Sequence, residues 1–357
     1  FGLYGVKRHP EIIKDATPSE LVGMLDAESE KIIDLAMEEL ERRFAQQSPD
    51  FELIQGLLGH ARPSVWGLAC RWLEDNFQAW VGDIQKVLSL HLDVHGPALL
   101  EIHRITKLGV SELAGIQRTE LAQTLLDLLR SGEKATDSHQ GIAILARENL
   151  VSELDALLTI DQLLELLETG STSAKTVAAE VLGRRSDGFE VLGFEGVLGL
   201  AESEIIAVRK AAQNLLRQAS GILSNDPSLL FAVVDSQWND NHDVAFEILR
   251  DQVAFEKLGL DGIIGLCDSS QADVQVFGRE LLKKHFELLD SQEVLFRLIE
   301  HPDTTMQAYA LELIEMHLGG GFVRLARIES FCRAILFDTW PDRALKQSLL
   351  EFLSSRA

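Results

Sequence analysis

Residues 208–216, Val-Arg-Lys-Ala-Ala-Gln-Asn-Leu-Leu, carry the pattern that decides the fold of this chain. Apolar residues stand at i, i+3, i+4, i+7 and i+8, and the residue at i+4, Ala212, is small. Residues three and four apart lie on the same side of an α-helix. The stretch therefore predicts an amphipathic helix whose buried face includes one small side chain.

This pattern recurs along the chain at a nearly constant interval. Its small residue is found at Ala36, Ala69, Ala178, Ala212, Ala245, Gly278 and Ala310. Apart from the long gap after Ala69, the steps between neighbours are 32 to 34 residues, a period typical of stacked helix pairs. A residue no larger than Ala lets neighbouring helices approach to about 8–10 Å. We therefore predict an all-α fold, a right-handed α-solenoid of about ten antiparallel helix pairs.

The repeats divide the chain into three parts. Residues 1–18 form an N-terminal segment, which we expect to be truncated because the chain begins with Phe1. Residues 19–318 hold the helical repeats. Residues 319–357 hold a break at Gly319-Gly320-Gly321 and a last helix pair that caps the array. Ala146 follows Ala69 at a step of 77 residues, and the stretch near 87–140 matches the pattern poorly, so we predict one degenerate pair and a long loop there.

Two stretches resemble a known repeat family. Pro63 to Leu73 and, more closely, Val208-Arg209-x-x-Ala212-x-x-x-Leu216 resemble HEAT repeats, in which a turn is followed by Val-Arg or Val-Lys and then by Ala and Leu at these offsets. The resemblance implies a HEAT-like superhelix, in which the second helix of each pair lines the concave face. Scaffolds, adaptors and a few enzymes share this architecture.

Composition limits the function classes. The 357 residues include 33 basic and 56 acidic side chains, a formal net charge of -23, which repels nucleic-acid phosphates and membrane surfaces of the same sign. Apolar stretches are shorter than the roughly 18 residues that a membrane-spanning helix needs. The 3 cysteines are far apart and form no Cys-x-x-Cys pair, so we expect reduced thiols and a cytoplasmic location.

A basic strip is the main candidate binding site. Five positions after the small residue, three successive repeats carry Arg217, Arg250 and Lys283. Further cations near enough to widen this strip are Arg279, Lys284 and Arg184. We predict that the strip contacts an acidic extended peptide or, as the weaker possibility, a nucleic-acid backbone. The alternative is a solvated face whose charges are balanced by Glu247, Asp251 and Glu280.

Two histidines are weak candidates for a metal site. His91 and His95 are four residues apart, which would place both imidazoles on one helical face, but the His-Glu-x-x-His pattern is absent. We expect them to be ordinary surface histidines. We predict neither a metal nor another cofactor.

Enzymatic alternatives find little support in the sequence. Phosphate-loop, nucleophile-elbow and dinucleotide-binding motifs are absent. A helical-repeat DNA glycosylase uses aromatic and acidic residues in a basic groove, for which this chain offers Trp66, Trp72, Trp80 and Asp75.

We therefore predict a non-catalytic scaffold or adaptor that binds another protein or an extended peptide, with any catalysis outside this segment. Two alternatives stay open. One is a protein that engages nucleic acid, as a glycosylase or as a subunit of a DNA- or RNA-acting complex. The other is a chaperone or lyase-type helper for a prosthetic group.

Overall fold

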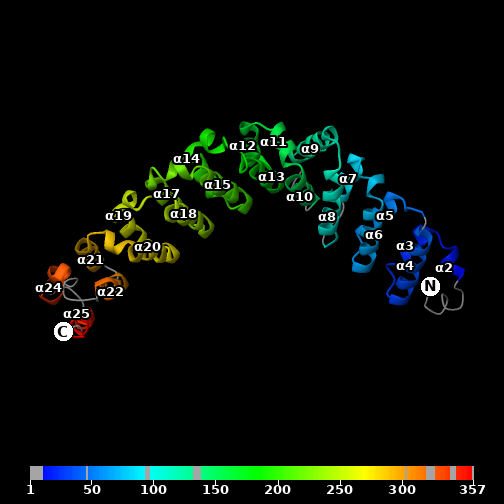
Figure 1. Ribbon diagram of the computed structural model, residues 1–357. Helices are drawn as coiled ribbons and strands as arrows, with labels where there is room; N and C mark the ends of the chain where they lie inside the picture. The colour runs from blue at the N-terminus through cyan, green and yellow to red at the C-terminus, as the bar shows by residue number, and fades with distance from the viewer. Residues whose placement is uncertain are drawn as a thin grey trace. The chain divides into compact units, whose positions relative to one another are not determined.

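The computed structural model describes residues 11–45, 47–92, 97–131, 138–301, 304–318, 326–337 and 343–355, and within these ranges it contains helices and connecting turns but no strand (Figure 1). The chain divides into two compact units. Unit 1 comprises the residues up to Gly188 together with Ser203–Ala211, and unit 2 comprises Phe189–Glu202 together with the residues from Ala212 onward.

Unit 1 contains a first layer and a second layer of helices (Figure 1). The first-layer helices are α3 (Pro18–Met24), α5 (Phe51–Leu58), α7 (Ile84–Leu92), α9 (Gly115–Arg130), α11 (Val151–Leu157) and α12 (Ile160–Thr169). The second-layer helices are α4 (Glu30–Phe44), α6 (Pro63–Asp75), α8 (Pro97–Ser111), α10 (Ser138–Asn149) and α13 (Thr172–Leu182). A short helix, α2 (Glu11–Asp15), precedes them, and the 3-10 turn η1 (Phe77–Ala79) follows α6.

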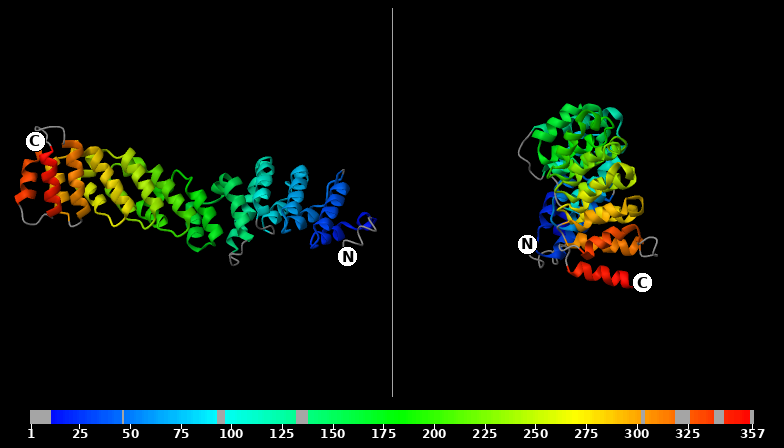
Figure 2. Two further views of the ribbon diagram at one scale, coloured as in Figure 1. Left: turned by 90° about the horizontal axis from the view of Figure 1, so that it is seen from below. Right: turned by 90° about the vertical axis from the view of Figure 1, so that its left-hand side faces the viewer.

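Unit 2 repeats the same two layers. Its first-layer helices are α17 (Pro227–Val234), α19 (Phe255–Cys267), α21 (Ser291–Ile299) and α24 (Glu329–Phe337). Its second-layer helices are α18 (Asn239–Asp251), α20 (Ala272–His285), α22 (Thr304–Leu313) and α25 (Arg343–Ser354), and neighbours such as α18 and α20 lie side by side (Figure 2). Short elements between them are α16 (Ser220–Leu223), η2 (Phe286–Leu288), the π-helical turn η3 (Ile314–Leu318) and η4 (Ala326–Ile328).

Two further helices, α14 (Gly188–Ala201) and α15 (Ile206–Gln218), span the division between the units. With them the described residues contain ten successive helix pairs, as the repeat pattern predicted. In α14 and α19, a glycine with a positive φ of 65°, Gly193 or Gly259, joins two helical segments. The repeat pattern matches only the segment after each glycine.

Helix starts follow local sequence. Thr17 caps α3 in a capping box with Glu20, and Thr159 does the same for α12 with Gln162. Asp226 caps α17 through the backbone N–H of Ser228, ahead of Pro227 at the first helical position. Such caps satisfy backbone donors that the first helical turn leaves free.

The small residues lie where the pattern placed them. Ala36, Ala69, Ala178, Ala212, Ala245 and Ala310 are all fully buried. Gly278 shows the reason most clearly, since a Cβ atom there would lie 2.7 Å from the backbone nitrogen of Cys267 and 2.9 Å from the carbonyl carbon of Leu266. The backbones of α20 and α19 therefore meet at this residue, and the chain is an array of HEAT-like helix pairs.

The one degenerate pair predicted near 87–140 is present, but much of the stretch expected as a long loop is helical. Helices α7 and α8 form this pair, and α9 occupies 115–130 as the first helix of the next pair. In α8 the small position is held by Thr106, which lies 37 residues after Ala69 and is fully buried. The i+7 position is Gly109, where a Cβ would lie 2.5 Å from a methyl of Val81.

A short helix lies at the N-terminal end of the array, and a helix pair lies at its C-terminal end. The N-terminal segment includes α2, which is tied to α4 because the Arg43 guanidinium donates to the carbonyls of Ile13 and Lys14 at 3.2 and 2.7 Å. The predicted break at Gly319-Gly320-Gly321 lies outside the described residues. The predicted last pair is present as α24 and α25. Phe331 of α24 and Leu349 of α25 are both buried. None of the described helices has the length and apolar character needed to cross a membrane.

Candidate functional site

The candidate functional site is the side of the second-layer helices that faces away from the first layer. We call it the second-helix face. It is defined by side chains two and five positions after each small residue. In unit 1 they include Glu41, Arg71, Glu74, Leu108 and Glu180, and in unit 2 they include Arg217, Glu247, Arg250, Glu280 and Lys283.

In unit 1, charges on this face pair from one helix to the next. Glu41 of α4 meets Arg71 of α6 at 2.7 Å, and Glu74 of α6 meets Arg104 of α8 at 2.6 Å. The guanidinium of Arg104 also contacts Glu101 of its own helix at 2.7 Å. Glu41 and Arg71 stand five and two positions after their small residues, so α4 and α6 are in register at this pair. Arg104 stands two positions before Thr106 and pairs with Glu74 outside that pattern.

In unit 2, the same register neutralises two residues of the predicted basic strip. Arg217 of α15 lies 2.9 Å from Glu247 of α18, and Arg250 of α18 lies 3.6 Å from Glu280 of α20. The Arg250 guanidinium also lies over the ring of Phe277, at 5.3 Å. These partners are two of the carboxylates that the sequence suggested as balancing charges.

The remaining strip residues have separate environments. Arg279 donates to the Thr305 hydroxyl at 3.1 Å and lies over the ring of Tyr309 at 5.7 Å, so it ties α20 to α22. Lys283 and Lys284 are exposed, and neither makes an ion pair with another described residue. Arg184 belongs to unit 1, where it meets Glu180 at 2.8 Å. Of the six predicted residues, Arg217, Arg250 and Arg184 each face a carboxylate.

His91 is a core residue, so the expectation of a surface histidine was wrong for it. Its side chain is buried, with Nδ1 3.0 Å from the carbonyl oxygen of Val87. Because a carbonyl can only accept, Nδ1 carries the hydrogen. Burial lowers the pKa of His91 to about 4, and the nearby His103 adds to the effect. The imidazole is therefore neutral at pH 7.

Near His91 lie the side chains of His103 and Glu148. His95 lies outside the described residues. His103 points its Nε2 at Glu148, 2.8 Å away, and its ring meets that of His91 edge to face at 6.2 Å. Within the part of the chain that the structure describes, no group of three or more His, Cys, Asp or Glu side chains is arranged to hold a metal ion.

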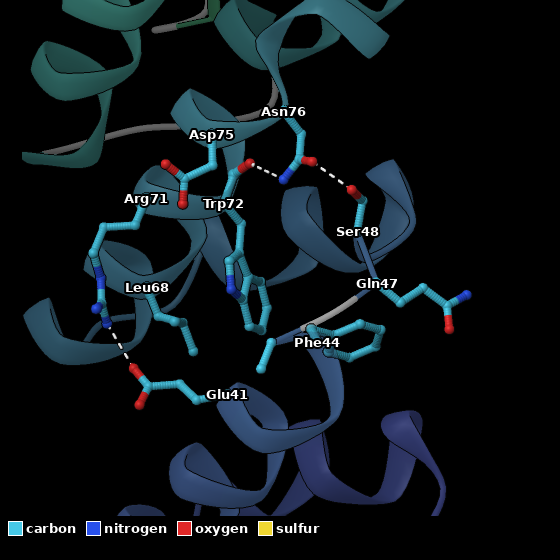
Figure 3. Close-up of a pocket in the computed structure, with 10 residues that line it drawn as sticks. Glu41, Phe44, Gln47, Ser48, Leu68, Arg71, Trp72, Asp75 and Asn76 are labelled. Atoms are coloured by element: carbon cyan, nitrogen blue, oxygen red, sulfur yellow. Dashed lines mark hydrogen bonds and ion pairs between the residues drawn. The ribbon is translucent and has the colours of Figure 1, made fainter.

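A hollow of about 460 Å³ opens between α4 and α6 (Figure 3). Its lining residues are Glu41, Phe44, Ala45, Gln47, Ser48, Leu68, Arg71, Trp72, Asp75 and Asn76. Glu41 and Arg71 belong to the second-helix face, so the hollow is part of that face.

The rings of Phe44 and Trp72 meet edge to face at 5.4 Å inside this hollow. On the rim, Asn76 donates to the carbonyl of Trp72 at 2.8 Å and accepts a hydrogen bond from Ser48. Asp75 is exposed, and no ion pair joins it to another described residue.

The hollow collects only two of the four residues suggested for a glycosylase-like site. Trp72 and Asp75 line it. Trp80 is instead buried and donates its indole N–H to the carbonyl of Leu73 at 2.9 Å. Trp66 does not line the hollow either. Sequence reasoning missed Phe44, Ser48 and Asn76, which carried no signal of their own.

Comparisons with known proteins give a weak likeness of fold. No protein-family model and no curated protein sequence matches this chain. Solved structures with a similar succession of helices include the crystal structure of Kap121p, with 12% identity, a TM-score of 0.36, and coverage of 97% of this chain and 45% of Kap121p. A mutant of Kap121p has 12% identity, a TM-score of 0.33, and coverage of 98% and 43%.

This chain thus spans less than half the length of those structures. TM-scores this low do not support transferring any property of Kap121p. The HEAT-like assignment rests on the helix pairs described above.

Proposed function

We propose that this chain is a protein-binding scaffold that uses the second-helix face to hold an extended segment of a partner. The observation that carries the proposal is the register of neighbouring second helices within each unit, seen in the pairs Glu41–Arg71, Arg217–Glu247 and Arg250–Glu280. A face built in this way presents similar rows of side chains at a regular interval. An extended chain can contact many such rows, and a few aromatic or Arg anchors then supply most of the binding free energy.

The pairing of charges bears on the class of partner. Arg217 and Arg250 each face a carboxylate, so a polyanion gains little from them unless those pairs are broken. With an overall charge of -23, the chain repels nucleic acid. We therefore favour a protein partner over nucleic acid, and we assign no catalytic role to the face. The three free cysteines support a reducing compartment such as the cytoplasm.

The test begins with selection of a displayed random-peptide library on the purified chain. Peptides recovered in repeated rounds are synthesised, and their Kd values are measured against variants of the second-helix face, Leu108→Asp, Arg217→Glu and Lys283→Glu. Matched control variants change the first-layer side: Ile116→Asp at the start of α9, and Arg297→Glu on α21, where Arg297 pairs with the exposed Asp261 at 3.1 Å.

We expect at least one second-helix variant to weaken binding about tenfold, as removal of an anchor residue does. The control variants should leave Kd unchanged. Recovery of no peptide, or peptides that respond only to the control variants, would contradict the proposal. Short duplex oligonucleotides are measured in parallel, and tight binding that weakens steeply with salt would favour the nucleic-acid alternative instead.

A further inference from the structure

The hollow between α4 and α6 has the chemistry of a site for a cation. Its apolar part is formed by Phe44, Leu68 and Trp72, and its rim carries the carboxylates of Glu41 and Asp75 (Figure 3). A cation close to an aromatic ring is attracted by the negative charge density of the ring face. A carboxylate beside the same ring adds a direct charge partner.

The aromatic part is held in place. The edge-to-face contact between Phe44 and Trp72, at 5.4 Å and an interplanar angle of 68°, joins the ends of α4 and α6. The body of Trp72 is packed in the core, and only 8% of the residue is exposed. The indole that lines the hollow is therefore preorganised, which lowers the entropy lost when a ligand group is placed against it.

The charges around the hollow are not balanced. Glu41 is paired with Arg71 at 2.7 Å, whereas Asp75 has no ion pair among the described residues. In Figure 3 the Asp75 carboxylate extends above the space between the Arg71 and Trp72 side chains. Two carboxylates and one guanidinium leave one negative charge at this site. Arg71 and Glu41 are both exposed, so their pair opens at little cost and frees a second carboxylate.

We propose that this hollow binds a basic side chain, Arg or Lys, of the partner protein, with its charged end between Asp75 and Glu41 and against Trp72. The inference rests on the proposed function and names the chemistry of the partner at one row of the second-helix face. Charge complementarity supports it, because a basic segment is attracted by a chain whose net charge is -23. An acidic peptide, which the sequence suggested, would meet the unpaired Asp75.

The test uses blocked pentapeptides, acetyl-Gly-Gly-X-Gly-Gly-amide, in which X is Arg, Lys or the uncharged arginine analogue citrulline. Binding is followed on the full chain by the indole N–H resonances of its 5 tryptophans, with Trp72→Phe used to assign the signal of Trp72. The variant Asp75→Asn removes the unpaired charge but keeps the shape of the side chain. Glu168→Gln, an exposed change on the first-layer helix α12, is the matched control.

We expect the Arg or Lys peptide to shift the Trp72 resonance saturably, and citrulline or Asp75→Asn to weaken that binding about tenfold, as loss of a charge-assisted hydrogen bond does. Glu168→Gln should leave binding unchanged. Equal binding of the citrulline peptide, no effect of Asp75→Asn, or shifts confined to other tryptophans would overturn the inference. Asp75 is exposed at the last residue of α6, where a negative charge is unfavourable to the helix, so its removal leaves folding intact.

The outcome separates this inference from the proposed function. Library peptides that bind through the second-helix face but ignore Asp75→Asn would leave the scaffold function standing and overturn only the cation site. A chain that binds neither library peptides nor pentapeptides would contradict both.

Discussion

The His242 imidazole joins two second-layer helices through a hydrogen bond to Asp273, with Nδ1 of His242 2.7 Å from Oδ2 of the carboxylate. Its other nitrogen, Nε2, lies 2.7 Å from the carbonyl oxygen of Ser236. Both nitrogens therefore lie within hydrogen-bond distance of an oxygen atom. His242 is fully buried at the start of α18, and Asp273 is at the start of α20.

We predict that His242→Phe lowers the free energy of unfolding by about 1–3 kcal/mol, because it leaves the Ser236 carbonyl and the Asp273 carboxylate without their partner. A double-mutant cycle with Asp273→Asn, measured by denaturant unfolding, isolates the pair. Additive effects of the two substitutions would contradict a direct interaction.

The pKa of Asp273 predicts the direction in which stability changes with pH. Burial alone would raise the pKa of Asp273, but the hydrogen bond and charge of His242, together with hydrogen bonds from the backbone at Val274 and Asp273, outweigh it, so this pKa is lowered from 3.8. A lowered carboxyl pKa means that the unfolded chain binds protons first as pH falls. The contribution of the pair is therefore complete above the ordinary pKa of the carboxyl and is lost below it. Asp273→Asn should flatten this acid limb of the stability curve.

The buried His91 predicts a second acid-sensitive contribution in a different pH range. Its pKa is about 4 in the folded chain against an ordinary value of 6.5, so between these values the unfolded state binds the proton and the folded state does not. Stability is therefore complete above pH 6.5 and falls as pH decreases toward 4. We expect a loss of about 2 kcal/mol between roughly pH 7.5 and 5 from this residue.

The measurement for His91 is urea unfolding across that pH range for the original chain and for His91→Phe. All other titratable groups are common to both proteins, so the difference between the two curves is assigned to His91. Parallel curves would show that the imidazole is not buried in its neutral form.

Gly278 and Gly265 form a matched pair of helix-interior glycines. A Cβ at Gly278 would approach the Cys267 nitrogen to 2.7 Å, whereas a Cβ at Gly265 would meet nothing within 4 Å. We predict that Gly278→Ala destabilises by about 1–3 kcal/mol through overpacking, with Gly278→Leu at least as damaging. Gly265→Ala should stabilise by about 0.5–1 kcal/mol. Thermal unfolding of the variants measures these changes in stability. If Gly278→Leu leaves stability unchanged, the register assigned to the repeats is wrong.

We predict that loss of the half-buried Arg118 lowers the free energy of unfolding more than loss of the exposed Arg104. Arg118 is half-buried, pairs with Glu153, and donates to the carbonyls of Asn149 and Val110 at 2.6 and 3.1 Å. Arg118→Ala should therefore cost about 2–4 kcal/mol, since it leaves several partners unsatisfied. Arg104→Ala, at an exposed pair, should cost under about 1 kcal/mol. Similar losses for both would show that the extra contacts of Arg118 contribute little to unfolding.

Much of the fold could be predicted because one physical requirement, close helix approach, recurs in the sequence. Wherever Ala or Gly filled the small position, as at Ala212 and Gly278, the helix pair was located correctly. The pair α7–α8 was predicted only as a degenerate pair, because Thr106 replaces the small apolar residue and because Val81, from outside the helix, fills the space left by Gly109.

The candidate site was less predictable because it depends on contacts between repeats. The sequence named Glu247 and Glu280 as balancing charges, and these are the partners of Arg217 and Arg250. The hollow gave no signal, since Phe44 and Trp72 come from different repeats and their pattern indicates only core packing. A gap between two helices depends on the register of both.

The most direct test of the central claim, that the second-helix face binds an extended partner segment, is site-resolved photo-crosslinking. A library-selected peptide carrying a benzophenone side chain is irradiated with the full chain, and the adducts are located by mass spectrometry. The account predicts adducts on α4, α6, α8, α18 or α20 that disappear with excess unlabelled peptide. Competable adducts confined to first-layer helices such as α5, α12, α19 or α21 would contradict it.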